Sequence, residues 1–283
     1  MHAGSRMILI EDSLKGISFS AHVVYPTDVP STPTMIGPFT FDVSPEAPLS
    51  EGIFPLVVIS HGGGGWNIVY RTISTHLARN GYIVVAPEHY KNNRNDNELE
   101  DTTENLENRP RHISLTIDTL VSNPDFREHV SAIRVAIIGH SMGGYTALAI
   151  AGGVPWTKDN QKVSVVRDPR ISALVLLAPA AAFFIPEDSL KNVTLPILML
   201  AAEHDPITPR WQDDVVLDGV PDRSKVTFRV IENAGHLSFL SPYPDHLKRQ
   251  GFFPAMDPEG FDREAFHEEL PIELEEFLAK YMK

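Results

Sequence analysis

Short apolar runs alternate with longer, partly polar segments over most of the chain. Such runs predict β-strands, and they lie at residues 56–60, 82–86, 134–139, 171–178, 197–202 and 226–231. Most are continuously apolar instead of alternating, which is typical of parallel strands covered by helices on both faces. The pattern therefore predicts a sheet that is buried on both sides.

The segments between these runs carry helix signals. Predicted helices cover residues 70–79, 110–122, 142–151 and 261–282. Asn80 and Gly81 supply a stop after the first helix, and Pro110 suits the first turn of the second. Strands alternating with helices predict an α/β fold with a mostly parallel central sheet and helices on both faces. Residues 7–14 and 17–25 predict an antiparallel hairpin at the sheet edge.

Three stretches do not fit this alternation, and they lie at residues 27–52, 91–109 and 239–260. Neither an internal repeat nor a linker between two cores is visible, so we expect a single domain over residues 1–283. Cap or loop insertions are predicted at 91–125, 180–193 and 239–260. The segment 91–109 is either a lid or a surface loop, and its charge and lack of apolar anchors favour the loop.

Composition narrows the possible partners and chemistry. Hydrophobic residues make up 42% of the 283-residue chain, which permits a sizeable core. The net charge of −13 disfavours nucleic acid and anionic membranes as partners, because phosphates are repelled. The absence of cysteine excludes a thiol nucleophile. We expect a cytoplasmic location and no membrane span, because the chain has neither a secretory signal nor an apolar stretch of about 20 residues.

The sequence Gly139-His140-Ser141-Met142-Gly143 matches the G-x-S-x-G pattern. It lies between a predicted strand and a predicted helix, the context in which a sharp turn projects the serine hydroxyl above the sheet. At such a helix N-terminus the Met142 amide can point at a developing oxyanion. We therefore predict that Ser141 is a nucleophile; the alternative is a chance Gly-Ser-Gly turn.

A serine at its ordinary pKa needs a base, and the base needs an orienting acid. In folds with this turn the order is serine, acid, histidine. Asp205 follows the predicted strand 197–202 and is the favoured acid. Glu203 is its competitor, with a structural hydrogen bond as its other role, and Asp213 and Asp214 are remoter candidates.

The histidine is expected after the last strand, and His236 follows the turn 233–235. It would take the serine proton during attack and return it to the leaving group. Position carries this choice, because the chain has 12 histidines. His140 is expected to pack beneath the turn, and His246 and His267 are expected on the surface.

A glycine-rich run, His61 to Gly65, follows the predicted strand 56–60. A loop of this type at this place supplies a second oxyanion donor, and the Gly63 amide is the predicted one. We expect His61 to brace the loop by hydrogen bonding. The alternative, a phosphate-binding loop, lacks the lysine or the ribose-binding acid that it needs. No cofactor is expected, and no metal, because no H-E-x-x-H motif occurs.

Aromatic residues near these motifs are candidates for an apolar substrate pocket. They are Trp66, Tyr70, Tyr145, Phe183, Phe184 and Phe239. The alternative for each is ordinary core packing.

Together these motifs resemble the α/β-hydrolase superfamily. More narrowly, the chain resembles bacterial predicted dienelactone hydrolases and, through them, the platelet-activating-factor acetylhydrolases. The segments that carry the resemblance are SHGGGGWNIVYRTISTHLARNGYIVVAPEH, RVAIIGHSMGG, RDPRISALVLLAPA and NAGHLSFL. The resemblance implies an α/β-hydrolase fold and a triad of Ser141, Asp205 and His236. It also implies that Gly63 and Met142 are the oxyanion donors.

True dienelactone hydrolases use a cysteine nucleophile, which this chain lacks, so carboxylic ester hydrolysis is the broader expectation. We expect an acyl-enzyme mechanism on small-molecule esters with short acyl groups. One alternative is an amidase or peptidase with the same triad. Another is a non-catalytic receptor of this fold, which would be expected to have a broken triad or oxyanion loop.

Overall fold

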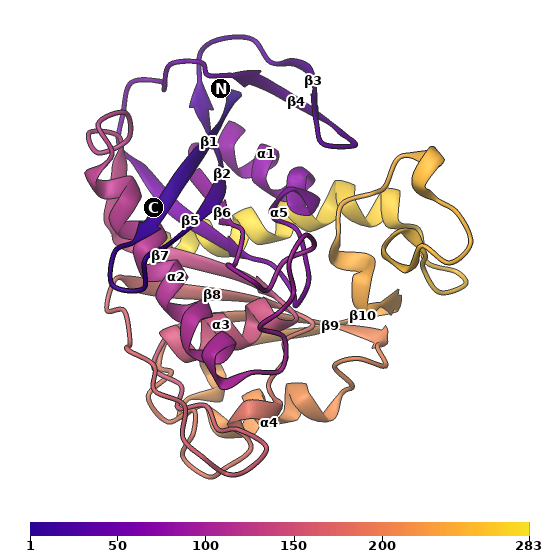
Figure 1. Cartoon of the computed structure of the whole chain (residues 1–283). Coiled ribbons are helices and arrows are strands. Elements are labelled where there is room, and N and C mark those ends of the chain that lie inside the picture. The colour runs from indigo at the N-terminus through magenta and orange to yellow at the C-terminus, as the bar shows by residue number, and fades with distance from the viewer. Residues whose placement is uncertain (283) are drawn as a thin grey trace.

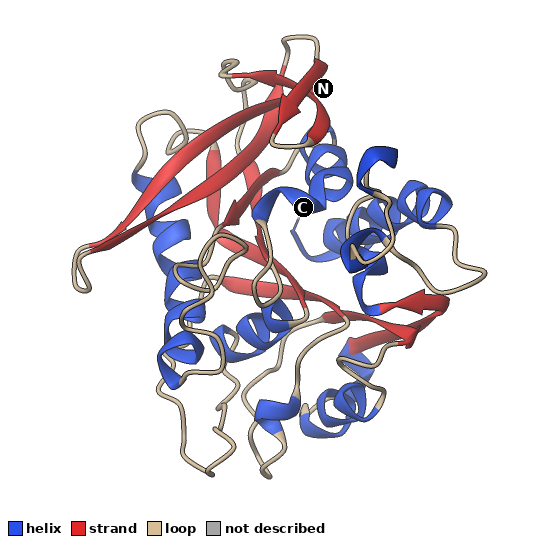
Figure 2. Cartoon of the chain, turned by 45° about the vertical axis from the view of Figure 1, so that its right-hand side comes forward, coloured by secondary structure: helices blue, strands red, loops and turns tan. Residues whose placement is uncertain are grey.

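The computed structural model describes residues 1–282, and these form one ten-stranded sheet with helices packed against it (Figure 1, Figure 2). Its order is β10 (Val226–Gly235), β9 (Ile197–His204), β8 (Ile171–Leu177), β7 (Val130–His140), β5 (Phe54–Ser60), β6 (Ile83–Pro87), β2 (Ile17–Thr27), β1 (His2–Asp12), β4 (Phe39–Pro45) and β3 (Thr32–Ile36). The strands from β10 to β6 are parallel. The predicted mostly parallel α/β sheet is confirmed.

Helices cover both faces of the sheet, which explains the continuously apolar strands. On one face lie α2 (Thr103–Ser122), α3 (Met142–Ile150) and α4 (Trp211–Gly219), and on the other lie α1 (Arg71–Arg79) and α5 (Arg263–Met282). Within β5, Leu56 and Val58 pack into the first layer, while Val57 and Ile59 pack into the second. A strand with two buried faces is therefore mostly apolar, and the buried Ser60 at the end of β5 hydrogen-bonds His89 (2.9 Å).

The N-terminal hairpin pairs as predicted but is not at the edge of the sheet. Strands β1 and β2 are antiparallel, and β4 and β3 extend the sheet beyond them. Both outer strands come from the stretch 27–52, for which the sequence pattern predicted neither a helix nor a strand. Phe39, Phe41 and Val43 alternate with polar residues there and are buried. That period of two was the available strand signal.

Helix α2 begins at Thr103, earlier than the predicted start at Pro110. The Thr102 side chain caps it by accepting a hydrogen bond from the Asn105 amide (3.1 Å). Pro110 lies inside the helix and has no N–H for the Leu106 carbonyl four residues before it. The Tyr145 hydroxyl of α3 donates to that carbonyl instead (2.9 Å). Much of the predicted insertion 91–125 is therefore a helix.

Of the remaining helices, one was predicted from the sequence and one was not. Helix α5 matches the predicted segment 261–282 closely, whereas α4 was not predicted. Within the described residues, no helix is long and apolar enough to cross a membrane.

Candidate active site

The predicted chemical residues follow the ends of four parallel strands. Ser141 is the first residue after β7, Asp205 the first after β9, and His236 the first after β10. The loop that begins with His61 follows β5, the neighbour of β7. Carboxyl ends of parallel strands lie along one edge of a sheet, where open α/β sheets bind their ligands. The fold therefore brings these four segments to a single edge.

The turn at Ser141 is strained and tightly held. Ser141 has φ 55° and ψ −119°, a backbone conformation that few non-glycine residues adopt. Its amide donates to the Leu177 carbonyl (3.0 Å), and its carbonyl accepts from the Ala180 amide (2.9 Å). A Cβ at Gly143 would lie 1.8 Å from the Ser60 carbonyl oxygen, so only glycine fits there. The turn thus carries the geometry expected of the G-x-S-x-G motif.

Asp205 and His236 form a buried ion-pair contact. Asp205 Oδ2 lies 2.7 Å from His236 Nδ1, and the side chains are 2% and 5% exposed. The other oxygen of Asp205 accepts hydrogen bonds from the Ile207 and Thr208 amides (both 2.8 Å). Burial opposes ionisation of Asp205, but the hydrogen bond and charge of His236 and the bonds from Thr208 together lower its pKa to about 2. Asp205 is therefore a carboxylate at neutral pH.

The competing acids have other partners. Glu203 is exposed and accepts a hydrogen bond from the Asn233 amide (2.8 Å), which is the structural role weighed for it. Asp214 pairs with Arg210 (2.9 Å) on α4. Asp213 is buried on the same helix, and burial raises its pKa to about 7. Among the described contacts of Glu203, Asp205, Asp213 and Asp214, it is Asp205 that accepts a hydrogen bond from the His236 ring.

His140 lies beneath the turn and connects it to His236. Its Nε2 lies 2.9 Å from the His236 carbonyl oxygen and must donate to it, so Nδ1 accepts from the Tyr70 hydroxyl (3.0 Å). Burial, followed by the charge of His236, lowers the pKa of His140 to about 3. A neutral His140 therefore joins the residue before Ser141 to the backbone of His236.

A second network supports the turn that bears His236. The Ser238 hydroxyl donates to Asp257 (2.6 Å), which also accepts two hydrogen bonds from the buried Arg263 (both 2.8 Å). His267 Nε2 contacts the Ser238 carbonyl (3.0 Å). The prediction that His267 lies on the surface is wrong, because its face of α5 packs toward this turn and leaves it 5% exposed.

The glycine loop after β5 lies against the Ser141 turn. A Cβ at Gly62 would lie 3.3 Å from the Ser141 Cβ, and one at Gly63 would lie 3.5 Å from the Met142 Cγ. Among the described hydrogen bonds, none has the Gly63 amide as donor. Met142 is the first residue of α3, and amides in a first helical turn have no acceptor within the helix. Two free N–H groups thus belong to segments that lie next to Ser141.

A cavity of about 220 Å³ opens beside Gly63 and Met142. Of the six aromatic candidates, Phe183 lines it, together with Leu106 and polar side chains of the segments 100–105 and 157–159. Four of the other candidates are packed in the core, which was the alternative to pocket lining. Tyr70, Tyr145, Phe184 and Phe239 are each at most 3% exposed. Trp66 packs against Phe39 and beneath the Arg94 guanidinium.

Comparison with known proteins places the chain in a family. A family model for chlorophyllases matches residues 31–184, more than half of the chain. The chain belongs to the chlorophyllase family. The matched range contains the glycine loop and Ser141 and ends before Asp205 and His236.

Relatives of this chlorophyllase-family chain match it only in part. Chlorophyllase-1 of Citrus unshiu is 30% identical over 140 residues, which cover 48% of this chain and 39% of that protein. Cutinase est1 of Thermobifida alba is 21% identical over 194 residues, or 68% of this chain and 56% of that protein. The matches therefore span less than two thirds of the length of these relatives.

Solved structures match this chain over nearly its whole length. A ferulic acid esterase from Streptomyces cinnamoneus has a TM-score of 0.74 at 18% identity and covers 99% of this chain and 90% of its own. A dienelactone hydrolase from Anabaena variabilis has a TM-score of 0.62 at 14% identity, with full coverage of both chains. The likeness shows the fold, and the predicted α/β-hydrolase fold is confirmed.

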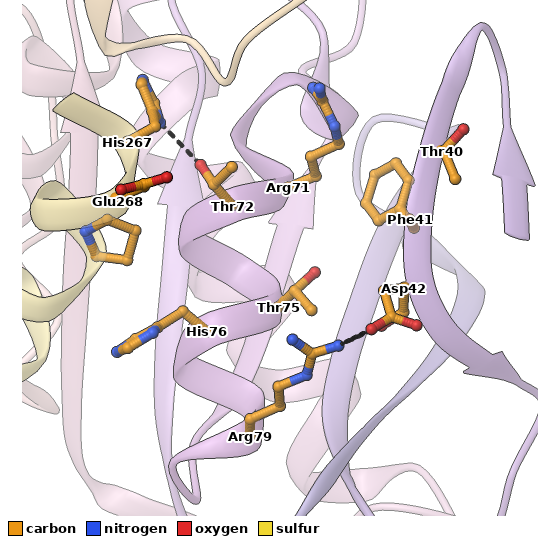
Figure 3. A pocket seen from close by; sticks show the side chains of 11 residues that line it. Thr40, Phe41, Asp42, Arg71, Thr72, Thr75, His76, Arg79, His267 and Glu268 are labelled. Carbon is orange, nitrogen blue, oxygen red and sulfur yellow. Dashed lines mark hydrogen bonds and ion pairs between the residues drawn. The ribbon is translucent and has the colours of Figure 1, made fainter. Parts of the chain in front are cut away.

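Another cavity of this chlorophyllase-family chain holds none of the candidate residues. It has a volume of about 320 Å³ and lies between β4, α1 and α5 (Figure 3). Two pairs of its polar side chains bond to each other, since Arg79 pairs with Asp42 and Thr72 bonds to His267 (2.8 Å). Among the described residues, no cluster of three or more His, Asp or Glu side chains is arranged to hold a metal ion.

Sequence reasoning missed two residues that contact the site. Thr208 follows Asp205 by three residues; its hydroxyl donates to Asp205 (2.8 Å) and lies 3.2 Å from His236 Nδ1. The ITP stretch after Asp205 carried no signal beyond the presence of a hydroxyl. Arg109, fully buried on α2, contacts the carbonyl of His61. It was hidden within a segment whose charges suggested a surface loop.

Proposed function

We propose that this protein is a serine carboxylic ester hydrolase in which Ser141, His236 and Asp205 form the catalytic triad. The observation that carries the proposal is the buried Asp205–His236 contact of 2.7 Å. It lies at the same sheet edge as the strained turn at Ser141. Burying an acid and a histidine costs free energy, and the pairing is what an acyl-transfer site needs.

The contact with Asp205 sets the tautomer of a neutral His236 ring. An ionised Asp205 only accepts hydrogen bonds, so the proton of neutral His236 is on Nδ1 and Nε2 is free. In the proposed reaction Nε2 takes the Ser141 proton as the oxygen attacks the ester carbonyl. It then protonates the leaving alcohol, which yields an acyl-enzyme. A water molecule, deprotonated by the same nitrogen, attacks the acyl carbon and releases the acid.

The amides of Gly63 and Met142 are the proposed oxyanion donors. Their segments lie next to Ser141, and neither amide donates to an acceptor among the described hydrogen bonds. Donors already aimed at the position where negative charge develops need no reorganisation during the reaction. The charge that forms on the carbonyl oxygen would therefore be stabilised in both halves of the reaction.

The relatives favour an ester over an amide as substrate. Their names include cutinase, bis(hydroxyethyl) terephthalate hydrolase and ferulic acid esterase. An amidase on the same triad needs stronger protonation of its leaving group, and no feature of the site beyond the triad serves that purpose. A non-catalytic receptor of this fold would be expected to lack part of the triad or the glycine loop. The presence of Ser141, His236 and the glycine loop therefore disfavours that alternative.

We further propose that the substrates are small esters with short acyl groups. The cavity beside Gly63 holds about 220 Å³, below the range of about 300–1,000 Å³ that accommodates drug-sized ligands. Such a cavity fits a few carbon atoms and excludes a large macrocycle. Polar side chains on much of its rim add no affinity for a long alkyl chain.

A series of p-nitrophenyl esters from acetate to decanoate tests this proposal. Overfilling a packed pocket costs about 1–3 kcal/mol, so kcat/KM is expected to peak between acetate and butyrate and to be roughly tenfold or more lower at decanoate. The matched amide, p-nitroacetanilide, is expected to react far more slowly than the acetate. A kcat/KM that rises with chain length would contradict the short-acyl assignment, and comparable amide turnover would favour the amidase.

A further inference from the structure

Arg109 is a buried cation without a carboxylate partner among the described ion pairs. It lies on α2 with no exposed surface. Its guanidinium donates to four neutral acceptors from three separate segments, which are the His61 carbonyl and Ser60 Oγ (3.4 Å), Asn92 Oδ1 (2.5 Å), and Thr146 Oγ1 (3.0 Å). Burying an unpaired charge is expensive. The four hydrogen bonds offset part of that cost. One of them holds the His61 carbonyl at the start of the glycine loop, so Arg109 is connected directly to that loop.

The contacts of His61 lead from Arg109 to the Gly63 amide. The His61 amide carbonyl is held by Arg109, and the His61 ring contacts the next carbonyl, that of Gly62, at 2.7 Å from Nδ1. The Gly62 carbonyl and the Gly63 N–H belong to one planar trans peptide and point in opposite directions. Fixing that carbonyl toward His61 therefore directs the Gly63 N–H away from the ring.

The ring of His61 can make this bond in one tautomer only. The His89 amide donates to His61 Nε2 (3.1 Å), so that nitrogen carries no proton and Nδ1–H donates to Gly62. A protonated ring would lose the His89 bond. Burial, and next the charge of Arg109, lower the pKa of His61 to about 3, and His112 and His140 also face it. The cation and the neutral ring thus stabilise the same arrangement.

We propose that Arg109 is a positioning residue, whose guanidinium holds the His61 backbone so that the His61 ring orients the Gly63 N–H for the oxyanion. The inference rests on the proposed ester hydrolysis for its kinetic consequence and on hydrogen bonds alone for its structural one. Arg109 touches no reacting atom and does not itself line the cavity, although its partner Asn92 does. Its removal should therefore affect the transition state more than substrate binding.

The kinetic experiment compares wild type with Arg109→Lys and Arg109→Gln on p-nitrophenyl acetate. Loss of an oxyanion donor costs about 10²–10³ in kcat. A misdirected donor in Arg109→Gln is expected to lower kcat roughly 10- to 100-fold, with KM within about threefold. Affinity for a phenylboronic acid, which forms a tetrahedral adduct on serine, should fall by a similar factor. Lysine keeps the charge but donates from a single nitrogen in place of the planar fork, so Arg109→Lys should retain an intermediate kcat.

Arg111→Gln is the matched control. Arg111 lies on the same helix, is partly exposed and makes a two-point ion pair with Asp12 (2.6 and 2.7 Å). Its loss is expected to reduce thermal stability and leave kcat unchanged. If Arg109→Gln behaves in the same way, with lower stability but wild-type kcat and boronate affinity, Arg109 is merely structural and the proposal is overturned. If Arg109→Gln does not fold, Arg109→Lys decides by the same two readouts.

A measurement without turnover separates this inference from the proposed function. Two-bond ¹H–¹⁵N correlation spectra of the His61 ring report its tautomer at pH 7. Wild type should show the proton on Nδ1, and Arg109→Lys or Arg109→Gln should show a mixed or altered state. An unchanged His61 signal in the variants would contradict the positioning role, even if wild type hydrolysed no ester.

Discussion

Replacing Ser141 with alanine is expected to lower kcat for p-nitrophenyl acetate by about a thousandfold or more. That is the scale of loss when the nucleophile of a serine triad is removed. The remaining rate would come from the oxyanion donors and from binding. Alanine at a positive φ is about as strained as serine, so the fold of the variant should be retained.

Ser189→Ala is the control for this variant. Ser189 is buried like Ser141, but its hydroxyl has no described hydrogen-bond partner, so its loss should change neither kcat nor stability greatly. Thermal unfolding of both variants would show that any loss of activity is not a loss of structure. A Ser141→Ala variant with at least a tenth of the wild-type kcat would rule out Ser141 as the nucleophile.

Replacing Asp205 with asparagine is expected to reduce kcat by about 10³- to 10⁴-fold with little change in KM. An asparagine amide donates where the carboxylate accepted, which favours the wrong tautomer of His236, with the proton on Nε2. That nitrogen can then no longer take the Ser141 proton. The neutral amide also cannot stabilise the imidazolium that forms in the transition state.

Glu203→Gln separates the two candidate acids. Glu203 is exposed, and its carboxylate accepts from the Asn233 amide, a role that a glutamine oxygen can fill. We therefore expect kcat within a few-fold of wild type. Should the two variants reverse this order, Glu203 would be the triad acid, and the Asp205 contact with His236 would be structural.

The sheet and the triad candidates could be predicted because their signals are local. A strand buried on both faces is mostly apolar, and such runs are visible without knowing their partners. The turn at Ser141 needs glycine at fixed positions on either side, so its sequence is short and continuous. Asp205 and His236 were found by their places after strands, because strand ends of one direction meet at one edge.

Arg109 and the aromatic residues could not be placed in the same way. The Arg109 side chain contacts residues from three separate segments, and none of those contacts is visible in the sequence near residue 109. Its polar neighbours in the sequence resembled a solvated loop, whereas in the structure α2 begins at Thr103 and contains Arg109. Tyr145 was a candidate for pocket lining, with core packing as the alternative; it is buried, and its hydroxyl donates to the carbonyl that Pro110 leaves without a partner in α2. Such pairings depend on how helices pack.

Covalent trapping tests the central claim most directly. The protein would be treated with a fluorophosphonate, which loses fluoride to an activated serine, and the labelled peptide would be identified by mass spectrometry. We expect one phosphonyl group per chain, attached to Ser141, with esterase activity lost in proportion to labelling. Labelling at another serine, or continued ester turnover by protein fully labelled at Ser141, would contradict the proposed triad.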